Sequence, residues 1–113
     1  MGPEKGSVMA HNYDAQRRET FETFKSAPKG QKLPETAVVD FLFFVEEADA
    51  NWKAFEKALR GKGFNPRKDG DLMIASYGPM PVTAEAIWQQ EKIGTELAIA
   101  YDFYPDGWDL GED

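Results

Sequence analysis

The chain has 113 residues, no cysteine and a formal net charge of −7 at pH 7. This length allows one hydrophobic core but not two independent ones, and an apolar share of 42% with eight Phe, four Tyr and three Trp argues against a wholly disordered chain. The lack of cysteine excludes disulfides, a thiolate nucleophile and a zinc site built on sulfur. We therefore expect one folded domain without thiol chemistry.

The charge is unevenly distributed along the chain. Residues 1–34 carry six basic and four acidic side chains, whereas residues 102–113 carry five acidic and no basic ones. Affinity for nucleic acid comes mainly from clustered Lys and Arg, so this balance favours a basic protein partner over direct nucleic-acid binding. The longest apolar run, residues 41–45, is too short to cross a bilayer, and the N-terminus lacks the apolar segment of a secretory signal. These features predict a cytoplasmic protein without a membrane partner.

Residues 1–34 are predicted to form a flexible N-terminal arm that contains a helix and a linker. Helical periodicity begins at about Tyr13 and ends near Ser26, where SAPKGQKLPE brings two prolines and a glycine. The folded domain is then expected to occupy residues 35–113.

The segment TAVVDFLFFV, Thr36 to Val45, is predicted to be a central strand because it is β-branched and aromatic and contains neither Gly nor Pro. Since side chains alternate between the faces of a strand, one face is uniformly apolar and the other is apolar apart from one carboxylate. The second face therefore requires a cover, either the preceding helix or a partner. The first face comprises Ala37, Val39, Phe41, Phe43 and Val45, and the second comprises Val38, Asp40, Leu42 and Phe44.

A helix is predicted within ADANWKAFEKALRGKGF, with Asp49 as its N-cap and its end at Gly61 or Gly63. A short strand that contains Pro66 follows. The Asp-Gly turn in KDGD joins this strand, as a hairpin, to the next strand at LMIASY, residues 72–77.

The longest helix is expected after GPMP, with Thr83 as its N-cap. Gly94 costs about 1 kcal/mol of helix propensity relative to Ala, which indicates a close approach of this helix to the sheet. Trp88 is expected to point off the inward stripe, and a fourth strand, interrupted by Pro105, is predicted over residues 103–110. The inward stripe is predicted at Ala86, Gln90, Ile93, Leu97 and Tyr101.

The order of elements is an extra N-terminal helix followed by β-α-β-β-α-β. This order predicts an α+β fold, a ferredoxin-like two-layer sandwich with two helices on one face of a four-stranded antiparallel sheet. In this topology the second and fourth strands are the edges, where Pro66 and Pro105 are tolerated. The two strands expected to lack proline form the predicted central pair.

The sequence from Thr36 to Trp108 resembles the regulator of ribonuclease activity B family, the ribonuclease E inhibitors. The resemblance is carried by KDGDLMIASY, similar to the family's Asp-Gly-Asp turn into an apolar strand, and by the closing DGW at residues 106–108. Family members typically show Tyr-Asp-Gly-Trp, whereas Pro105 occupies the Tyr position here and Tyr104 stands one place earlier. A one-residue shift sends a strand side chain to the other face. The resemblance implies a cytoplasmic, non-enzymatic protein that binds ribonuclease E outside its catalytic core and alters which transcripts it cleaves.

Catalytic, metal and cofactor sites are not predicted. His11 is the single histidine and lies in the arm, and a nucleophile-base pair would need Ser76 to meet it. The acidic residues near the C-terminus lack the spacing of a calcium loop, which favours a solvated acidic end. These acidic residues are Asp102, Asp106, Asp109, Glu112 and Asp113.

Two aromatic anchors and their neighbours are the candidate partner-binding residues, because Trp is enriched among the residues that dominate interface energies. Two other functions stay open: an RNA-binding module of ferredoxin-like fold, and a small hydrolase-type enzyme that uses surface carboxylates. Against RNA, LMIASY offers one Tyr and no positive charge. Prolines on the edges disfavour strand pairing between copies, so a monomer or weak dimer is expected. The candidates are Trp108, Asp106, Gly107, Tyr104, Leu42, Phe44 and Trp88.

Overall fold

A computed structural model of the chain describes residues 11–26, 33–45 and 50–111. It divides into two compact units, Met1–Gln31 and Lys32–Asp113. The first unit contains α2 (Tyr13–Lys25), the predicted N-terminal helix. The side chain of its N-cap, Asn12, accepts a hydrogen bond of 2.9 Å from the amide of Ala15, which satisfies one of the free donors at the helix start.

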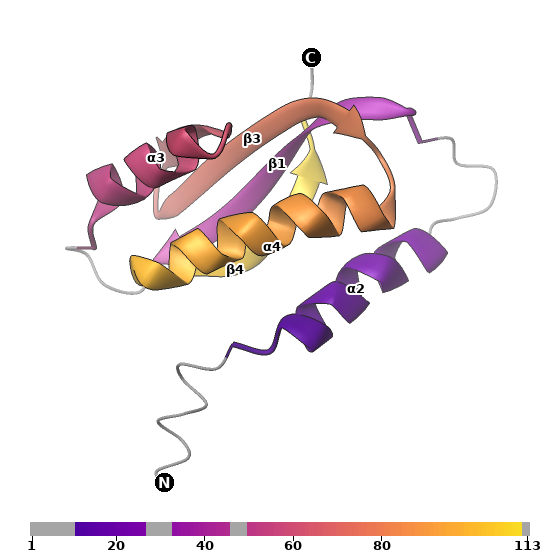
Figure 1. Ribbon diagram of the computed structural model, residues 1–113, viewed down its shortest axis with the longest axis horizontal. Coiled ribbons are helices and arrows are strands. Elements are labelled where there is room, and N and C mark those ends of the chain that lie inside the picture. The colour runs from indigo at the N-terminus through magenta and orange to yellow at the C-terminus, as the bar shows by residue number, and fades with distance from the viewer. Residues whose placement is uncertain (1–10, 27–32, 46–49, 112–113) are drawn as a thin grey trace, which may run out of the picture. The chain divides into compact units, whose positions relative to one another are not determined.

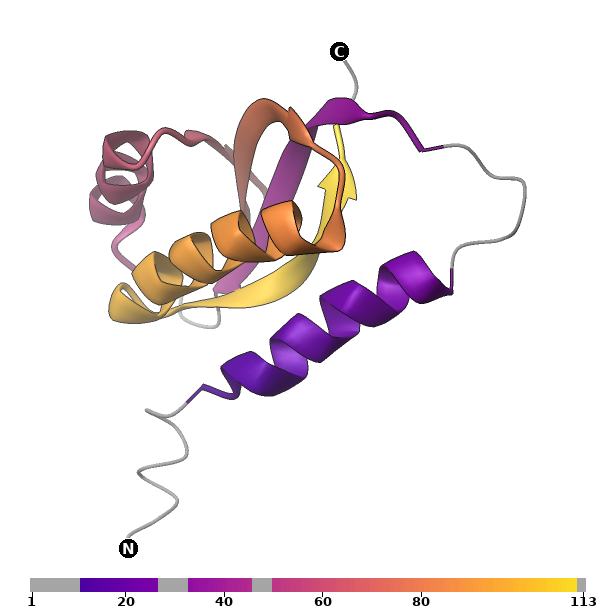
Figure 2. The same ribbon diagram turned by 45° about the vertical axis from the view of Figure 1, so that its right-hand side comes forward.

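The second unit is a four-stranded antiparallel sheet with two helices. Its strands are arranged in the order β2-β3-β1-β4, and α3 and α4 lie on the same side of the sheet (Figures 1 and 2). This arrangement confirms the predicted ferredoxin-like α+β sandwich. The elements are β1 (Thr36–Val45), α3 (Trp52–Gly61), β2 (Asn65–Asp69), β3 (Leu72–Pro81), α4 (Ala84–Ala100) and β4 (Phe103–Leu110).

Aromatic side chains fill the space between the sheet and its helices. The rings of Phe43 on β1 and Phe55 on α3 meet edge to face with centroids 5.5 Å apart, and Phe55 lies 4.5 Å from Phe103 on β4. All three side chains are at most 1% exposed. Burial of this kind stabilises the fold by about 2 kcal/mol or more for each ring. The predicted inward face of β1 is confirmed at its centre.

The ends of α3 differ in part from the prediction. The N-cap is Asn51, whose side chain accepts a hydrogen bond from the amide of Ala54, and not Asp49, which lies outside the described residues. The predicted glycine stop is confirmed: Gly63 has a φ of +92°, and the amide of Phe64 donates to the carbonyl of Leu59. Together with the bond from the Gly63 amide to the Arg60 carbonyl, this is a Schellman motif.

The side-chain cap of α3 is expected to contribute to the stability of the fold. Asn51→Ala leaves the Ala54 amide without its side-chain acceptor, so the free energy of unfolding should fall by about 1 kcal/mol in urea denaturation. Asn51→Asp, which also caps well, should retain most of the stability. Equal losses of unfolding free energy in both variants would contradict a capping role.

Helix α4 begins as predicted but presents a different face to the sheet. The side chain of Thr83 accepts a hydrogen bond of 3.1 Å from the amide of Ala86, as expected of an N-cap. The predicted inward stripe is wrong, because its members are half-buried and Trp88, expected to point off it, is only 7% exposed. The buried positions are Ile87, Trp88, Glu91, Gly94, Thr95 and Ala98.

Gly94 explains this orientation. A Cβ at this position would stand 2.9 Å from Cζ of Phe43 and 3.8 Å from Cζ of Phe64, closer to Phe43 than real side chains approach. Only glycine lets the helix come this near to the sheet, and the residues one turn away must then also face inward. The close approach predicted for Gly94 is confirmed.

Strand β3 is longer than predicted and contains proline. It continues through GPMP to Pro81, and its partner strand β1 carries a register shift between Ala37 and Val39. A central strand without proline was expected, and this expectation is wrong. Beyond Ser76, β3 pairs with β1 alone, because β2 pairs only with residues 72–76, so the prolines have a free edge beside them. Pro66 and Pro105 lie on the edge strands, as predicted.

Candidate functional site

The register of the strands determines which side chains share a face of the sheet. Phe41 is opposite Ala75 and Phe43 is opposite Met73, on the side covered by α3 and α4. The alternate positions therefore face away from both helices. We call this side the open face, and its strand residues are Asp40, Leu42, Phe44, Asn65, Arg67, Asp69, Leu72, Ile74, Ser76, Tyr104, Asp106 and Asp109.

One half of the open face is apolar. Leu42 is opposite Ile74 and Phe44 is opposite Leu72 on β3, and on the other side the Phe44 ring lies 5.7 Å from the ring of Tyr104. Ile74 is 7% exposed, whereas the other four side chains are half-buried. Apolar side chains from three strands thus form one continuous patch, which neither α3 nor α4 covers (Figure 1).

The other half of the open face carries a polar cluster across three strands. The hydroxyl of Ser76 on β3 donates a hydrogen bond of 2.5 Å to the carboxylate of Asp40 on β1. Arg67 on β2 donates to the Ser76 hydroxyl at 3.1 Å and lies 3.7 Å from the Asp40 carboxylate. The Asp40 side chain is 18% exposed and that of Arg67 is 57% exposed. The cluster satisfies a carboxylate that would otherwise be costly among apolar neighbours.

The C-terminal strand adds negative charge beside this cluster. Asp109 is directly opposite Asp40, so two carboxylates face each other across β1 and β4. Asp109 and Asp106 are both exposed, and neither forms an ion pair within the described part of the chain. Directly opposed like charges destabilise a sheet modestly, and a cation placed between them would relieve this cost.

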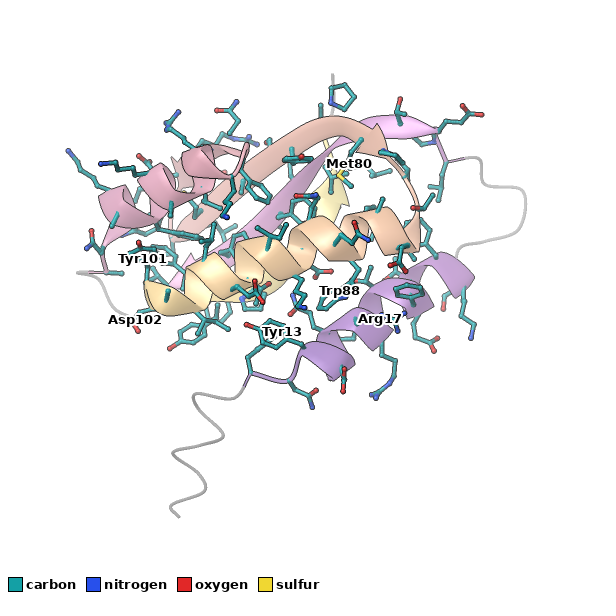
Figure 3. The ribbon with its side chains drawn as sticks, in the orientation of Figure 1. Tyr13, Arg17, Met80, Trp88, Tyr101 and Asp102 are labelled. Carbon is teal, nitrogen blue, oxygen red and sulfur yellow. The ribbon has the colours of Figure 1, made fainter. Side chains whose placement is uncertain are left out.

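The candidate residues from the sequence fall into two groups. Leu42, Phe44 and Tyr104 come together on the open face, and Asp106 lies beside them on β4. Trp108 is opposite Phe41, on the side of the sheet that carries the helices, and Trp88 lies on α4 (Figure 3). The sheet thus separates the two tryptophans from the aromatic residues of the open face.

Gly107 produces this separation. It has a φ of +94° and lies where β4 shifts register against β1, between the pairs Phe43 with Pro105 and Phe41 with Trp108. Such a bulge adds one residue to the strand and changes which face the following side chains occupy. Tyr104, one place before the position of the family's usual Tyr, faces the open side, whereas Pro105 faces the helices.

Apart from Leu42, Phe44, Tyr104 and Asp106, the residues of the open face were not predicted from the sequence as site residues, among them Arg67, Leu72, Ile74 and Ser76. The alternation of Leu72, Ile74 and Ser76 along LMIASY could have assigned them to the face of Leu42, once β1 and β3 were paired. No sequence pattern pointed to Arg67, because its role depends on the position of the short edge strand β2.

The residues considered for catalysis each have a partner within their own unit. The Nε2 atom of His11 lies 2.7 Å from Oε1 of Gln16, and its ring meets that of Tyr13. Ser76 is bonded to Asp40 instead. Residues 11–26, 33–45 and 50–111 contain no group of three ligating side chains able to hold a metal ion, and no helix among them is long and apolar enough to span a bilayer. Glu112 and Asp113 lie outside the described residues.

The second unit is an α+β two-layer sandwich in which one sheet face, not covered by α3 or α4, is lined by apolar and acidic side chains. Comparison with family models shows the family to which this chain belongs. Residues 14–110 match the family described as Regulator of ribonuclease activity B, and the chain belongs to this family, RraB, whose members regulate ribonuclease activity. The match begins within α2 and so includes a helix that the resemblance over residues 36–108 left out. Comparison with curated proteins finds no match.

Proposed function

We propose that this protein is a non-catalytic regulator that binds ribonuclease E and alters which transcripts the enzyme cleaves. The family match over residues 14–110 supports the regulatory role. The open face supports the proposed binding surface, because apolar side chains of three strands remain half-buried there in a folded unit. A surface of this kind gains about 25 cal/mol for each Å² of apolar area that a partner covers.

The chemistry of the open face is suited to contact and not to bond-making. Ser76 is the residue of this face whose hydroxyl lies beside a carboxylate. This hydroxyl donates a hydrogen bond to Asp40 and accepts one from the Arg67 guanidinium. A serine nucleophile would need a base such as histidine to take its proton. His11 is instead bonded within the first unit to Gln16.

The proposed interaction is tested by isothermal titration calorimetry of the full chain with the non-catalytic scaffold region of ribonuclease E. Binding in the micromolar range or tighter is expected, together with a changed cleavage pattern when the chain is added to full-length ribonuclease E. The absence of any heat change at several temperatures, with unaltered cleavage, would contradict the proposal.

Substitutions on the two sides of the sheet then locate the surface. Tyr104→Ala removes a half-buried ring that packs on Phe44, so the dissociation constant should rise about tenfold, equivalent to 1.4 kcal/mol. Trp108→Ala, on the side of the helices, serves as the comparison and should have a smaller effect if the partner sits on the open face alone. A partner that wraps around the β4 edge would be weakened by both changes. Loss of affinity in Trp108→Ala alone would move the site to the other side.

A further inference from the structure

We infer that the open face recognises a partner segment in which a Lys or Arg side chain stands next to apolar anchors, with the cation received between Asp40 and Asp109. This inference rests on the proposed function and specifies the chemistry of the partner. Its basis is that an apolar patch and carboxylates in excess of cations lie together on a sheet face that neither α3 nor α4 covers.

The charges of the open face are not balanced within the face. Its strand residues include four carboxylates and one guanidinium, on Asp40, Asp69, Asp106, Asp109 and Arg67. The guanidinium lies on the β2 side of Asp40, 3.7 Å from its carboxylate, whereas Asp109 lies on the β4 side. The Arg67 guanidinium therefore contacts Asp40 from the side that is away from Asp109. A second cation from a partner would relieve the repulsion between the opposed carboxylates and gain a charge-assisted hydrogen bond.

The spacing along β1 specifies the arrangement of the partner segment. Asp40, Leu42 and Phe44 are alternate residues of one strand, so Leu42 and Phe44 lie about 7 and 13 Å from Asp40 along the sheet. An extended partner segment would match this spacing if its basic residue stood two positions from one apolar residue and four positions from another. A helix, which rises 1.5 Å per residue, would match it with separations of about five and about nine positions.

Two other occupants fit the face less well. A second copy of the chain would bring the same excess of carboxylates against itself, and its formal net charge of −7 adds general repulsion. RNA carries phosphates that these carboxylates would repel, and Arg67 is already engaged by Asp40 and Ser76. A segment with basic and apolar side chains complements both halves of the open face.

The test uses charge reversal in the full chain with the ribonuclease E scaffold region as the probe. Asp109→Lys is expected to raise the dissociation constant more than tenfold, and Asp109→Asn several-fold. The matched control is Glu96→Lys, since Glu96 is an exposed carboxylate on α4, away from the open face, and its reversal should change affinity less than twofold beyond a general charge effect. Neither Asp109 variant should lower the melting temperature, because each removes a repulsion; a purely structural role for Asp109 would lower it.

The outcomes separate this inference from the function on which it rests. If the wild-type chain does not bind the scaffold region, the proposed function fails. If it binds and Asp109→Lys behaves like Glu96→Lys, the inference is overturned while the proposed function stands. The scaffold segment protected from hydrogen exchange should contain Lys or Arg at the spacing given above, and protection of an acidic segment would overturn the inference. Light scattering that shows a dimer disrupted by Asp109→Lys, or gel shifts that show RNA binding at low salt, would also overturn it.

Discussion

Gly94→Val is expected to lower the free energy of unfolding by about 3 kcal/mol. A Cβ at this position would lie 2.9 Å from Cζ of Phe43 and 3.6 Å from its Cε2, and Phe43 is 1% exposed, so its ring has no free space to enter. Overpacking of this kind typically costs 1–3 kcal/mol, and Val adds two further methyl groups against the same ring. Urea denaturation and thermal unfolding should report the loss, the latter as a fall in Tm of roughly 10–15 °C.

Two variants serve as controls for this prediction. Gly61 ends α3, and a Cβ there meets nothing within 4 Å, so Gly61→Ala should raise stability by up to about 1 kcal/mol through helix propensity alone. Phe43→Leu makes room at the contact with Gly94, so Gly94→Ala should cost less in that background than in the wild-type chain. Additive losses in the double variant, or a stabilised Gly94→Val, would show that α4 does not approach the sheet at Gly94.

Phe43→Ala is expected to act mainly on stability, and Phe44→Ala mainly on binding. Phe43 is 1% exposed and packs edge to face on Phe55, so its truncation should cost about 4 kcal/mol of stability. Phe44 is half-buried on the open face, so its truncation should cost about 1.5 kcal/mol and weaken scaffold binding by tenfold or more.

The two residues are neighbours in one strand with identical side chains, so only the face that each occupies differs. Affinity is compared at a temperature where both variants are still folded, as judged by circular dichroism. Phe43→Ala should then bind within about threefold of the wild-type chain, because its ring does not reach the open face. Equal affinity losses in both variants would indicate that binding responds to general destabilisation and not to the open face.

Much of the fold follows from local patterns in the sequence. Strand β1 spans Thr36–Val45 and β4 spans Phe103–Leu110, both as predicted, because β-branched and aromatic runs are bounded there by turn residues. The caps at Thr83 and Gly63 also follow from short-range chemistry, since a hydroxyl or a residue with positive φ is needed at those positions.

The orientation of α4 could not be predicted in the same way. Ile87, Trp88, Ile93, Leu97 and Ile99 place apolar side chains around most of this helix, so its periodicity does not select one face. The contact of Gly94 with Phe43, two residues 51 positions apart, decides which face is buried. The prolines of β3 were similarly misjudged because the length of its neighbour β2 determines where β3 has a free edge.

The candidate site was predicted only in part for a related reason. Leu42 and Phe44 follow from the alternation along β1, but their neighbours depend on the register between strands. Tyr104 is brought to them by the pairing of β1 with β4, and the bulge at Gly107 sends Trp108 to the opposite side. A single residue with positive φ therefore decides which aromatic side chains share a surface, and no periodicity in the sequence reveals it.

The central claim, that the open face is where ribonuclease E docks, is tested most directly by methyl resonances in a nuclear magnetic resonance titration with the scaffold region. The methyl groups of Leu42, Leu72 and Ile74 should shift or broaden as the scaffold is added, while those of Leu59 and Ile87, which are 0% exposed on the other side of the sheet, should stay in place. The opposite result would contradict this claim: calorimetry shows that the complex forms, but the resonances of Leu42, Leu72 and Ile74 stay unchanged. Shifts would then be confined to Ile93 and Ile99 on α4.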